Sequence, residues 1–344
     1  MIVIPVAELE AFAARVLVAV GASGANAARV AEALVSSHLA GLDSHGLQHL
    51  PGYVRGIHLG HIVPTAEPVV AAEDESYALV RGNWTFGHVS AAFATRLAIE
   101  KAASRKIAMV GLVEATHIGR LGEYAEMAAA ANQIAMLVSG GLGVDQPAAV
   151  PYGGREPVLH TNPIAMGFPA DGWPMILDFA TTATAGSKVL MALTRGEHMP
   201  PGCLVDRDGR PTTDPAALFH HGGAHLPFGG HKGSALMLAV ELLGRVLSGA
   251  DDYAEPGRGH QGVTIIAIDP AAFQPLDGFR GRTEAMLERV RAVPPAPGFS
   301  EVLVPGDPEH RARQKRRASG IPIPAATWRE LTELAASLGV AVGA

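Results

Sequence analysis

Residues 42–53, LDSHGLQHLPGY, bring together side chains that could move a proton. His45 is a candidate general acid or base, because an imidazole titrates near neutrality and can both donate and accept a proton. Ser44 beside it can hydrogen-bond a substrate oxygen. Apolar residues at helical spacing on both sides predict a helix–helix junction, where Asp43 or Ser44 could instead serve only as a helix cap. The free N–H groups of a helix start would also suit a substrate carboxylate.

A second candidate histidine, His117, lies in the segment THIGRLG. The apolar run 107–113 predicts a buried strand and 121–130 predicts a helix, so His117 falls in the loop between them. Such loops often carry catalytic groups, and Gly119 and Gly122 allow a ligand or backbone to approach closely. The alternative is a histidine that only hydrogen-bonds within a turn.

The remaining histidines do not predict a metal site. The chain has 15 histidines but no H-E-x-x-H motif, and its 1 cysteine cannot form a pair of thiolate ligands. The histidines that crowd together lie in glycine-rich loops rather than on one helix face. They are His58, His61, His220, His221, His225 and His231.

The first of three glycine-rich loops, 138–154, argues against a Rossmann site. From Gly141 the pattern G-x-G-x-x-G fails, because Gln146 stands at the third glycine position. No acidic residue follows a second strand at the expected distance.

The second loop follows a predicted short strand, 175–177. Asp178 stands at the strand tip, where a carboxylate could accept hydrogen bonds from ribose hydroxyls or an amide. Thr181 and Thr182 could bind phosphate. The alternative is that Asp178 or Thr181 caps a helix over 183–193.

The third loop, LPFGGHKGS, opens an amphipathic helix predicted over 234–248 and closed by Gly249. It is not a Walker A motif, because Lys232 precedes Gly233 rather than following it. A lysine at a glycine-rich helix start makes a good anion site. The alternative is a solvated lysine on a turn.

Together these clusters resemble the malate/L-lactate dehydrogenase-like family of NAD(P)-dependent oxidoreductases. This non-Rossmann family also includes ureidoglycolate and sulfolactate dehydrogenases, diketogulonate reductase and piperideine-2-carboxylate reductase. The resemblance runs in order over nearly the whole chain. It is carried by GLDSHGLQHLPGY, ATHIGRLGEYAEMA, PYGGREPVLHTNPIAMGFP, LDFATTATAGSKV, MPPGCLVDRDGRPTTDP, LPFGGHKGSALMLAVELL, QGVTIIAIDP, VPGDPE and ASGIPIP.

The resemblance implies hydride transfer between a nicotinamide and a small 2-hydroxy or 2-oxo acid. It places the catalytic roles on Ser44, His45 and His117, and leaves open which histidine is the general acid/base. The cofactor is NAD or NADP. The residues that the resemblance assigns to cofactor binding are Leu177, Asp178, Phe179, Ala180, Thr181, Thr182, His231, Lys232, Pro305, Gly306 and Asp307.

The substrate side departs from the family pattern. His49 stands where many members have an arginine that can pair a carboxylate through two hydrogen bonds. Either another cation such as Arg120 pairs with the substrate carboxylate, or the substrate is not a simple 2-oxo acid. Tyr53 is retained, either as part of the substrate pocket or as ordinary helix packing. Further departures near the expected site are Ser139, His160 and the pair Gly186–Ser187.

Composition limits the class of protein. A net charge of −6 argues against nucleic acid as the main partner. The lone Cys203 excludes an internal disulfide framework and fits a reducing compartment, so we expect a cytoplasmic protein. No run predicts a targeting segment or membrane span. The basic run 310–317 is expected to be a solvated helix face, with contact to an NADP phosphate as the alternative.

The order of elements predicts an α/β protein of the α+β type, since the middle lacks a steady βαβ alternation. The resemblance implies a cofactor-binding domain on a largely antiparallel sheet, 119–271. A mainly helical substrate and dimerisation domain would combine 1–118 with 272–344, in a homodimer. The preferred function is a 2-hydroxyacid dehydrogenase. The alternatives are a cyclic imino acid reductase and a non-catalytic ligand-binding homologue.

Overall fold

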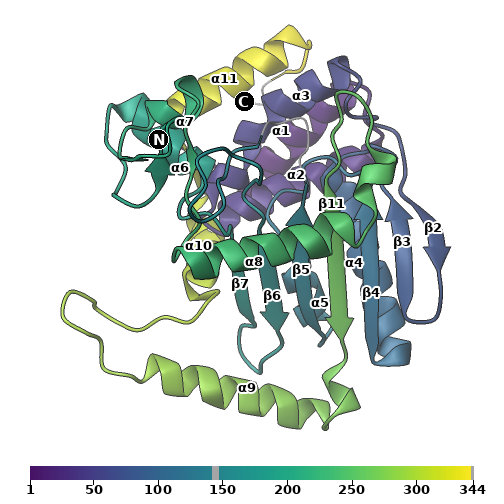
Figure 1. Cartoon of the computed structure of the whole chain (residues 1–344). Coiled ribbons are helices and arrows are strands. Elements are labelled where there is room, and N and C mark those ends of the chain that lie inside the picture. Colours follow the sequence, from purple (N-terminus) through teal and green to yellow (C-terminus); the bar gives the residue numbers. More distant parts are fainter. Residues whose placement is uncertain (142–146, 342–344) are drawn as a thin grey trace.

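The computed structural model describes residues 1–141 and 147–341. Gln146, which decides the Rossmann comparison in the first glycine-rich loop, lies outside these ranges, as does Gly143. Within them the chain builds one large sheet, two small sheets and the helices around them (Figure 1).

The large sheet is mixed but mostly antiparallel. Its described strands run in the order β2-β3-β4-β11-β5-β6-β7, and only β3 and β4 pair in parallel. Their bounds are β2 Val69–Glu73, β3 Tyr77–Arg81, β4 Ile107–Val113, β5 Ile134–Gly140, β6 Ile164–Phe168, β7 Met175–Phe179 and β11 Gly262–Ile268. This sheet confirms the predicted fold class, because a Rossmann domain would need a run of parallel strands.

An alanine-rich helix covers one face of the sheet. In α4 (Gly87–Arg105), Ala91, Ala94, Ala98 and Ala102 recur at helical spacing and are fully buried. Alanine favours the helix because it loses no side-chain entropy, and its small side chain lets the helix lie close to the strands.

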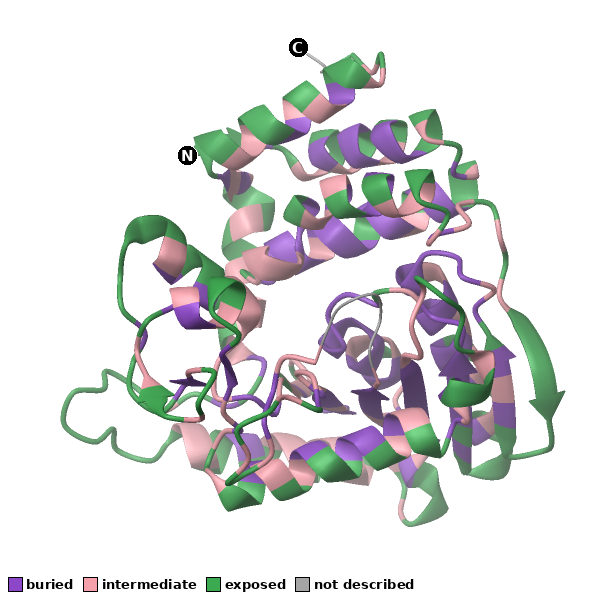
Figure 2. Cartoon of the chain, turned by 45° about the horizontal axis from the view of Figure 1, so that its top comes forward, coloured by how far each residue is buried: buried purple, intermediate pink, exposed green. Residues whose placement is uncertain are grey.

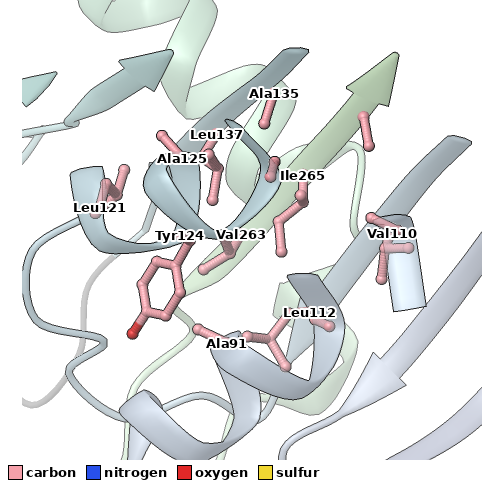
Figure 3. Packing of buried hydrophobic residues seen from close by; sticks show 14 of the residues in the cluster. Ala91, Val110, Leu112, Leu121, Tyr124, Ala125, Ala135, Leu137, Val263 and Ile265 are labelled. Carbon is pink, nitrogen blue, oxygen red and sulfur yellow. The ribbon is translucent and has the colours of Figure 1, made fainter. Parts of the chain in front are cut away.

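The shorter helix α5 (Gly122–Ala130) packs beside α4 and places the largest buried side chain in the core. Tyr124 is fully buried and packs with Leu112, Val263 and Ala91 (Figure 3). Its hydroxyl donates to the carbonyl of Ile118, so the buried polar atom is satisfied. That bond also fixes the loop that carries His117.

The opposite face is crossed by α8 (His231–Glu241) and its continuation η3 (Leu242–Val246), a turn of π-helix (Figure 1). Glycine is required where η3 meets the sheet, since a Cβ on Gly244 would lie 2.3 Å from the amide nitrogen of Gly140. The helix ends before Gly249, which has a φ of +70°. The predicted helix is thus confirmed, with its start three residues earlier than predicted.

Both chain ends contribute to a mainly helical part, as the fold class predicted. Its described helices are α1 (Val6–Ala19), α2 (Gly24–Leu39), α3 (Leu50–His58) and α11 (Ala325–Ser337). The antiparallel pair β1 (Ile2–Ile4) and β12 (Ile321–Ile323) joins the two ends. Figure 2 shows the buried faces of these helices turned toward one another.

Apart from two short turns between α2 and α3, the remaining described elements lie between and around these two parts. They are α6 (Gly186–Arg195), β8 (Leu204–Val205), β9 (Pro211–Thr212), α7 (Ala216–His220), β10 (Ala224–His225), η4 (Ala250–Tyr253), η5 (Pro270–Ala272), α9 (Leu276–Arg291) and α10 (Asp307–Ser319). The proline-rich connector 292–300 contains no helix or strand. The division of the chain into two domains stays a prediction. Its boundary at 118/119 falls between β4 and β5, which both pair with β11.

Candidate active site

The predicted helix–helix junction is built from two 3₁₀ turns, η1 (Asp43–His45) and η2 (Leu47–His49), between α2 and α3. Gly46 separates them because the His38 ring lies against it: a Cβ there would stand 2.2 Å from His38 Nε2. The prediction that Asp43 or Ser44 caps the next helix is wrong, because α3 begins at Leu50 without a side-chain cap.

Asp43 turns back toward the protein interior instead. Its Oδ1 accepts a hydrogen bond from His38 Nδ1 at 2.8 Å, while His38 Nε2 accepts from the Leu47 N–H at 3.0 Å. Arg316 donates to both carboxylate oxygens of Asp43. Burial alone would raise the pKa of Asp43, but the bonds from His38 and Arg316 lower it to about 2. Asp43 is therefore a carboxylate that holds the loop.

The loop carries two histidines toward His117. The ring centroids of His49 and His117 are 4.7 Å apart, and those of His45 and His117 are 6.4 Å apart and stacked. His88, from α4, meets His117 edge-on at 6.2 Å. The structure thus brings together His45, His49 and His117, predicted from separate motifs, and adds His88, which the sequence gave no reason to select.

Hydrogen bonds orient the rings within this histidine cluster, defined as His45, His49, His88 and His117. The Tyr53 hydroxyl lies 2.8 Å from His117 Nδ1, and Ser44 Oγ lies 3.0 Å from His45 Nδ1. His49 Nε2 donates to the Ser44 carbonyl at 2.9 Å, which leaves its Nδ1 without a hydrogen.

The surrounding protein lowers the pKa of each of these rings, with His88 buried, His45 and His49 half-buried and His117 exposed at the open side of the cluster. Loss of hydration lowers the pKa of His45 to about 4, with help from the neighbouring His49 and from the charge of Arg120. It lowers the pKa of His88 to about 3 and that of His117 well below its usual value. Burial also raises the pKa of Tyr53, so its hydroxyl stays protonated. The neutral rings can accept a proton, and their lowered pKa values favour its return.

Arg120 supplies the nearby positive charge. Its side chain is buried and binds Glu126 at 3.0 Å. Burial alone would lower the pKa of Arg120, but the carboxylates of Glu126, Asp178 and Glu123 outweigh it. Its Nε has no hydrogen-bond partner among the described residues. Arg120 also lines a cavity of about 50 Å³, with Asp178 and Gly306 on its wall.

Of the predicted cofactor residues at the end of β7, some make hydrogen bonds within the chain and one is exposed. Asp178 Oδ2 accepts from the Gly122 N–H at 2.7 Å, so it joins the strand end to the start of α5. Burial raises the pKa of Asp178. The ring of Phe179 is 42% exposed, while Leu177 and Ala180 are half-buried. Thr181 Oγ1 donates to the carbonyls of Thr161 and Asn162, and Thr182 Oγ1 donates to that of Thr184.

Those contacts also correct the capping alternative for this segment. Helix α6 begins at Gly186 after Ala185, with no side-chain cap, so neither Asp178 nor Thr181 caps it.

The loop before α8 lies against the end of β7. The Phe228 N–H donates to the Thr181 carbonyl at 3.0 Å, and the Phe228 and Phe179 rings meet edge-on at 5.7 Å. His231 and Lys232 are exposed in the first turn of α8. Two predicted cofactor segments are therefore neighbours.

The third predicted cofactor segment meets the start of β7. The Ile176 N–H donates to the Pro305 carbonyl at 3.2 Å. Gly306 has a φ of +99°, and a Cβ there would lie 3.2 Å from the Ile176 nitrogen. The Asp307 carboxylate is held by Arg291 at 2.9 and 3.1 Å.

Two of the departures from the family pattern also have defined surroundings. The charge of His160 contributes to lowering the pKa of His117, after burial and three nearer histidines. Ser139 Oγ accepts from Gln261 Nε2 at 2.9 Å. Ser139 lies near the end of β5, whereas His160 precedes β6 in the chain.

Sequence reasoning missed the arginines of α10. The run 310–317 was expected to be a solvated face, but Arg313 is buried and binds Glu126, and Arg316 binds Asp43. The one signal in the sequence was their spacing: Arg313 and Arg316 are three residues apart, so on a helix they lie on the same face.

The described part of the chain contains neither a group of metal ligands nor a membrane-spanning helix. No group of three histidine, cysteine or acidic residues there is placed to hold a metal ion. No helix in it combines the length and hydropathy that crossing a membrane requires.

The profile of the malate/L-lactate dehydrogenase family matches residues 4–332. The chain belongs to this family. It is 37% identical over 299 residues to the L-sulfolactate dehydrogenase of Methanothermobacter thermautotrophicus, covering 85% of this chain and 84% of that protein.

Solved structures of family members agree with this fold. The malate dehydrogenase of Entamoeba histolytica superposes with a TM-score of 0.92 at 28% identity, over 99% of each chain. The Δ1-piperideine-2-carboxylate reductase of Pseudomonas syringae superposes with a TM-score of 0.86 at 34% identity, over 97% of this chain and 100% of that one.

Proposed function

We propose that this family member transfers a hydride between a nicotinamide cofactor and a small 2-hydroxy or 2-oxo acid. The observation that carries the proposal is the histidine cluster, in which imidazoles from two separate loops meet, with the ring centroids of His45 and His49 lying 6.4 and 4.7 Å from that of His117. Oxidation of an alcohol needs a base for the hydroxyl proton, and a neutral imidazole that a substrate can reach can serve as one.

The residues at the edge of the large sheet fit a nicotinamide dinucleotide. Gly229, with a φ of +57°, has open space where a Cβ would stand, directly before the N-terminus of α8. Lys232 adds a positive charge there, which suits a pyrophosphate. The exposed ring of Phe179 offers an apolar surface beside Asp178. When bound, the cofactor would supply the hydride donor or acceptor at nicotinamide C4.

His117 can take the hydroxyl proton at Nε2, because its Nδ1 already faces the Tyr53 hydroxyl. In the neutral ring that can accept at Nε2, the hydrogen is on Nδ1, so Nδ1 donates to the Tyr53 oxygen both before and after the proton arrives. His45 can act in the same way, with Ser44 at its Nδ1. In the reduction direction, the histidine returns the proton to the substrate oxygen.

We propose that Arg120 pairs with the substrate carboxylate. His49 does not provide a fixed positive charge, because burial lowers its pKa and its Nε2 is used by the Ser44 carbonyl. Arg120 is charged, acts on His45, and has an Nε free of partners among the described residues. His49 and Tyr53 would line the same substrate side as neutral groups.

The protein is proposed to work as a cytoplasmic homodimer with the two domains predicted above. An apolar face on α8 and η3 supports self-association, since Leu238, Leu242 and Val246 are 51%, 50% and 56% exposed at helical spacing. Exposed apolar faces of this kind are typical of subunit interfaces. A single buried cysteine supports a reducing compartment.

A cyclic imino acid reductase is a second candidate. The similarity to the Pseudomonas reductase and the uncharged His49 favour it. A ring nitrogen that becomes protonated on reduction could use the same histidines.

The test is turnover of NADH and NADPH with a panel of 2-oxo acids and cyclic imino acids, followed through the near-ultraviolet absorbance of the reduced nicotinamide. Turnover of 2-oxo acids supports the proposal, and comparing the two cofactors decides between NAD and NADP. Turnover of imino acids alone would move the assignment to the second candidate. Cofactor binding without any turnover would indicate a non-catalytic homologue.

A further inference from the structure

Helix α10 packs behind the loop that carries Ser44 and His45, although it comes near the end of the chain. It contacts α2, the helix that leads into that loop. Two of its arginines point into the protein and end on buried or half-buried carboxylates, Asp43 and Glu126. Basic residues on the same helix that face solvent, such as Lys315 and Arg317, make no such contacts with described residues.

Arg316 fastens the loop. Its Nη1 and Nη2 reach Asp43 Oδ1 and Oδ2 at 2.5 and 3.2 Å, and Nη1 also donates to the His38 carbonyl. Asp43 in turn accepts from His38, whose Nε2 accepts from the Leu47 N–H. A planar guanidinium that binds both carboxylate oxygens fixes orientation as well as distance. Ser44 and His45 follow Asp43 directly, so their placement depends on this network.

Arg313 fastens a second group. Its Nη2 donates to both oxygens of Glu126 at 2.8 and 2.7 Å, and its Nη1 donates to Ser36 Oγ at 3.3 Å. Glu126 also binds Arg120 at 3.0 Å. The Glu126 carboxylate therefore lies between an arginine on α10 and the arginine proposed to meet the substrate.

We propose that α10 positions both halves of the site: Arg316 sets the acid/base loop through Asp43, and Arg313 sets Arg120 through Glu126. Neither arginine touches the substrate, so both are positioning residues. This inference rests on the proposed function for its kinetic consequences, but its structural consequence does not.

Loss of the Arg316–Asp43 contact and loss of the Arg313–Glu126 contact should change the kinetics in different ways. Arg316→Met should lower kcat about tenfold with KM for the acid changed less than about twofold, because the proton-transfer geometry is lost while carboxylate binding remains. Arg313→Met should raise KM for the acid about tenfold with kcat changed less than about twofold. Arg317→Met, the matched control on the same helix, should change neither.

A merely structural role would not produce two further results. Removing Arg316 removes a bond that lowers the pKa of Asp43, so the acidic limb of the kcat profile should move to higher pH. Added guanidinium should restore part of the lost kcat of Arg316→Ala, whereas it should not help Arg317→Ala. Arg316→Lys keeps the positive charge but cannot bind both oxygens of Asp43 through two nitrogens, so its kcat should stay below that of the wild type.

Hydrogen exchange tests the inference independently of turnover. Deuterium uptake by the peptide covering residues 40–49 should be faster in Arg316→Met than in wild type, and unchanged in Arg317→Met. If the wild type turns over no acid while this difference is seen, the proposed function fails and the positioning role stands. Equal uptake in all three proteins, or a kcat of Arg316→Met within twofold of wild type, would overturn the inference.

Discussion

The histidine cluster and the edge of the sheet proposed for the cofactor are built in opposite ways. In the cluster, the rings pack against one another around buried His88 and Tyr53, and hydrogen bonds within the chain orient them, as Tyr53 orients His117. At the edge, Phe179 and Lys232 are exposed, and Gly229 before α8 leaves open space where a Cβ would stand.

This difference suggests a division of tasks. Proton transfer is sensitive to small errors in position, so the groups that carry it gain from side chains that are held in place by their neighbours. Holding a large, charged cofactor requires an accessible surface that the ligand itself completes. Substitutions in the cluster should therefore affect kcat strongly, whereas those at the edge should mainly affect cofactor affinity.

The largest effect is expected from the histidine at the centre of the cluster. His117→Ala should lower kcat by about a hundredfold or more, the usual consequence of losing a general acid/base. Steady-state turnover with saturating cofactor measures it, beside His45→Ala as the comparison and the exposed His58→Ala as a control. If His117→Ala keeps wild-type turnover, the ring belongs to the packing of the cluster and His45 alone handles the proton.

Stability should fall in mild acid because the cluster resists protonation. The unfolded chain binds protons at these histidines below their usual pKa of 6.5, whereas folded His45 and His88 bind them only near pH 4 and pH 3. Since the unfolded state then holds more protons, the free energy of unfolding decreases as pH falls from about 6.5 to about 4.5, on the order of 2 kcal/mol for each ring.

Urea denaturation at both pH values measures this decrease. In His88→Gln, the decrease in unfolding free energy should be smaller by roughly the contribution of that one ring, because glutamine does not titrate. His58→Gln, at an exposed position, should leave the decrease as it is. An equal pH dependence in wild type and His88→Gln would show that His88 is charged or hydrated in solution.

A smaller loss is expected from the partner of His117. Tyr53→Phe keeps the ring but removes the hydroxyl that orients His117 at Nδ1, so kcat should fall about tenfold while the melting temperature changes little. The pair His117→Ala and Tyr53→Phe should not be additive, because both act on one proton-transfer unit. Additive losses would mean that Tyr53 acts on the substrate directly.

The smallest change is expected at the edge of the sheet. Lys232→Met should raise KM for the cofactor about threefold to tenfold, and kcat should stay close to wild type. The effect should shrink as ionic strength rises, because salt screens an exposed charge. Lys188→Met, another exposed lysine, serves as the control. A large loss of kcat in Lys232→Met would break the comparison between the two regions.

Local patterns were enough to predict the elements that present the site. The apolar run of β4, the helix after it, and the strand that ends near Asp178 followed from periodicity, because a buried face imposes it on neighbouring residues. His45 and His117 were selected as separate motifs. Their approach to 6.4 Å depends on how α2, α3 and β4 pack, which no local pattern contains.

What escaped prediction was long-range pairing of polar groups. Asp43 was expected to cap a helix, but it binds Arg316, 273 residues away in the chain. The basic run on α10 looked solvated because the carboxylates that it meets come from distant segments. Buried ion pairs leave little trace in a single sequence, since each partner alone has the composition of a surface residue.

The most direct test of the account is a crystal structure of the protein with its nicotinamide cofactor and an unreactive 2-oxo acid analogue. The account predicts the nicotinamide C4 beside the imidazoles of His45 and His117, the analogue's carboxylate against Arg120, and the rest of the dinucleotide passing Phe179 toward Lys232. A dinucleotide bound away from both imidazoles would contradict it.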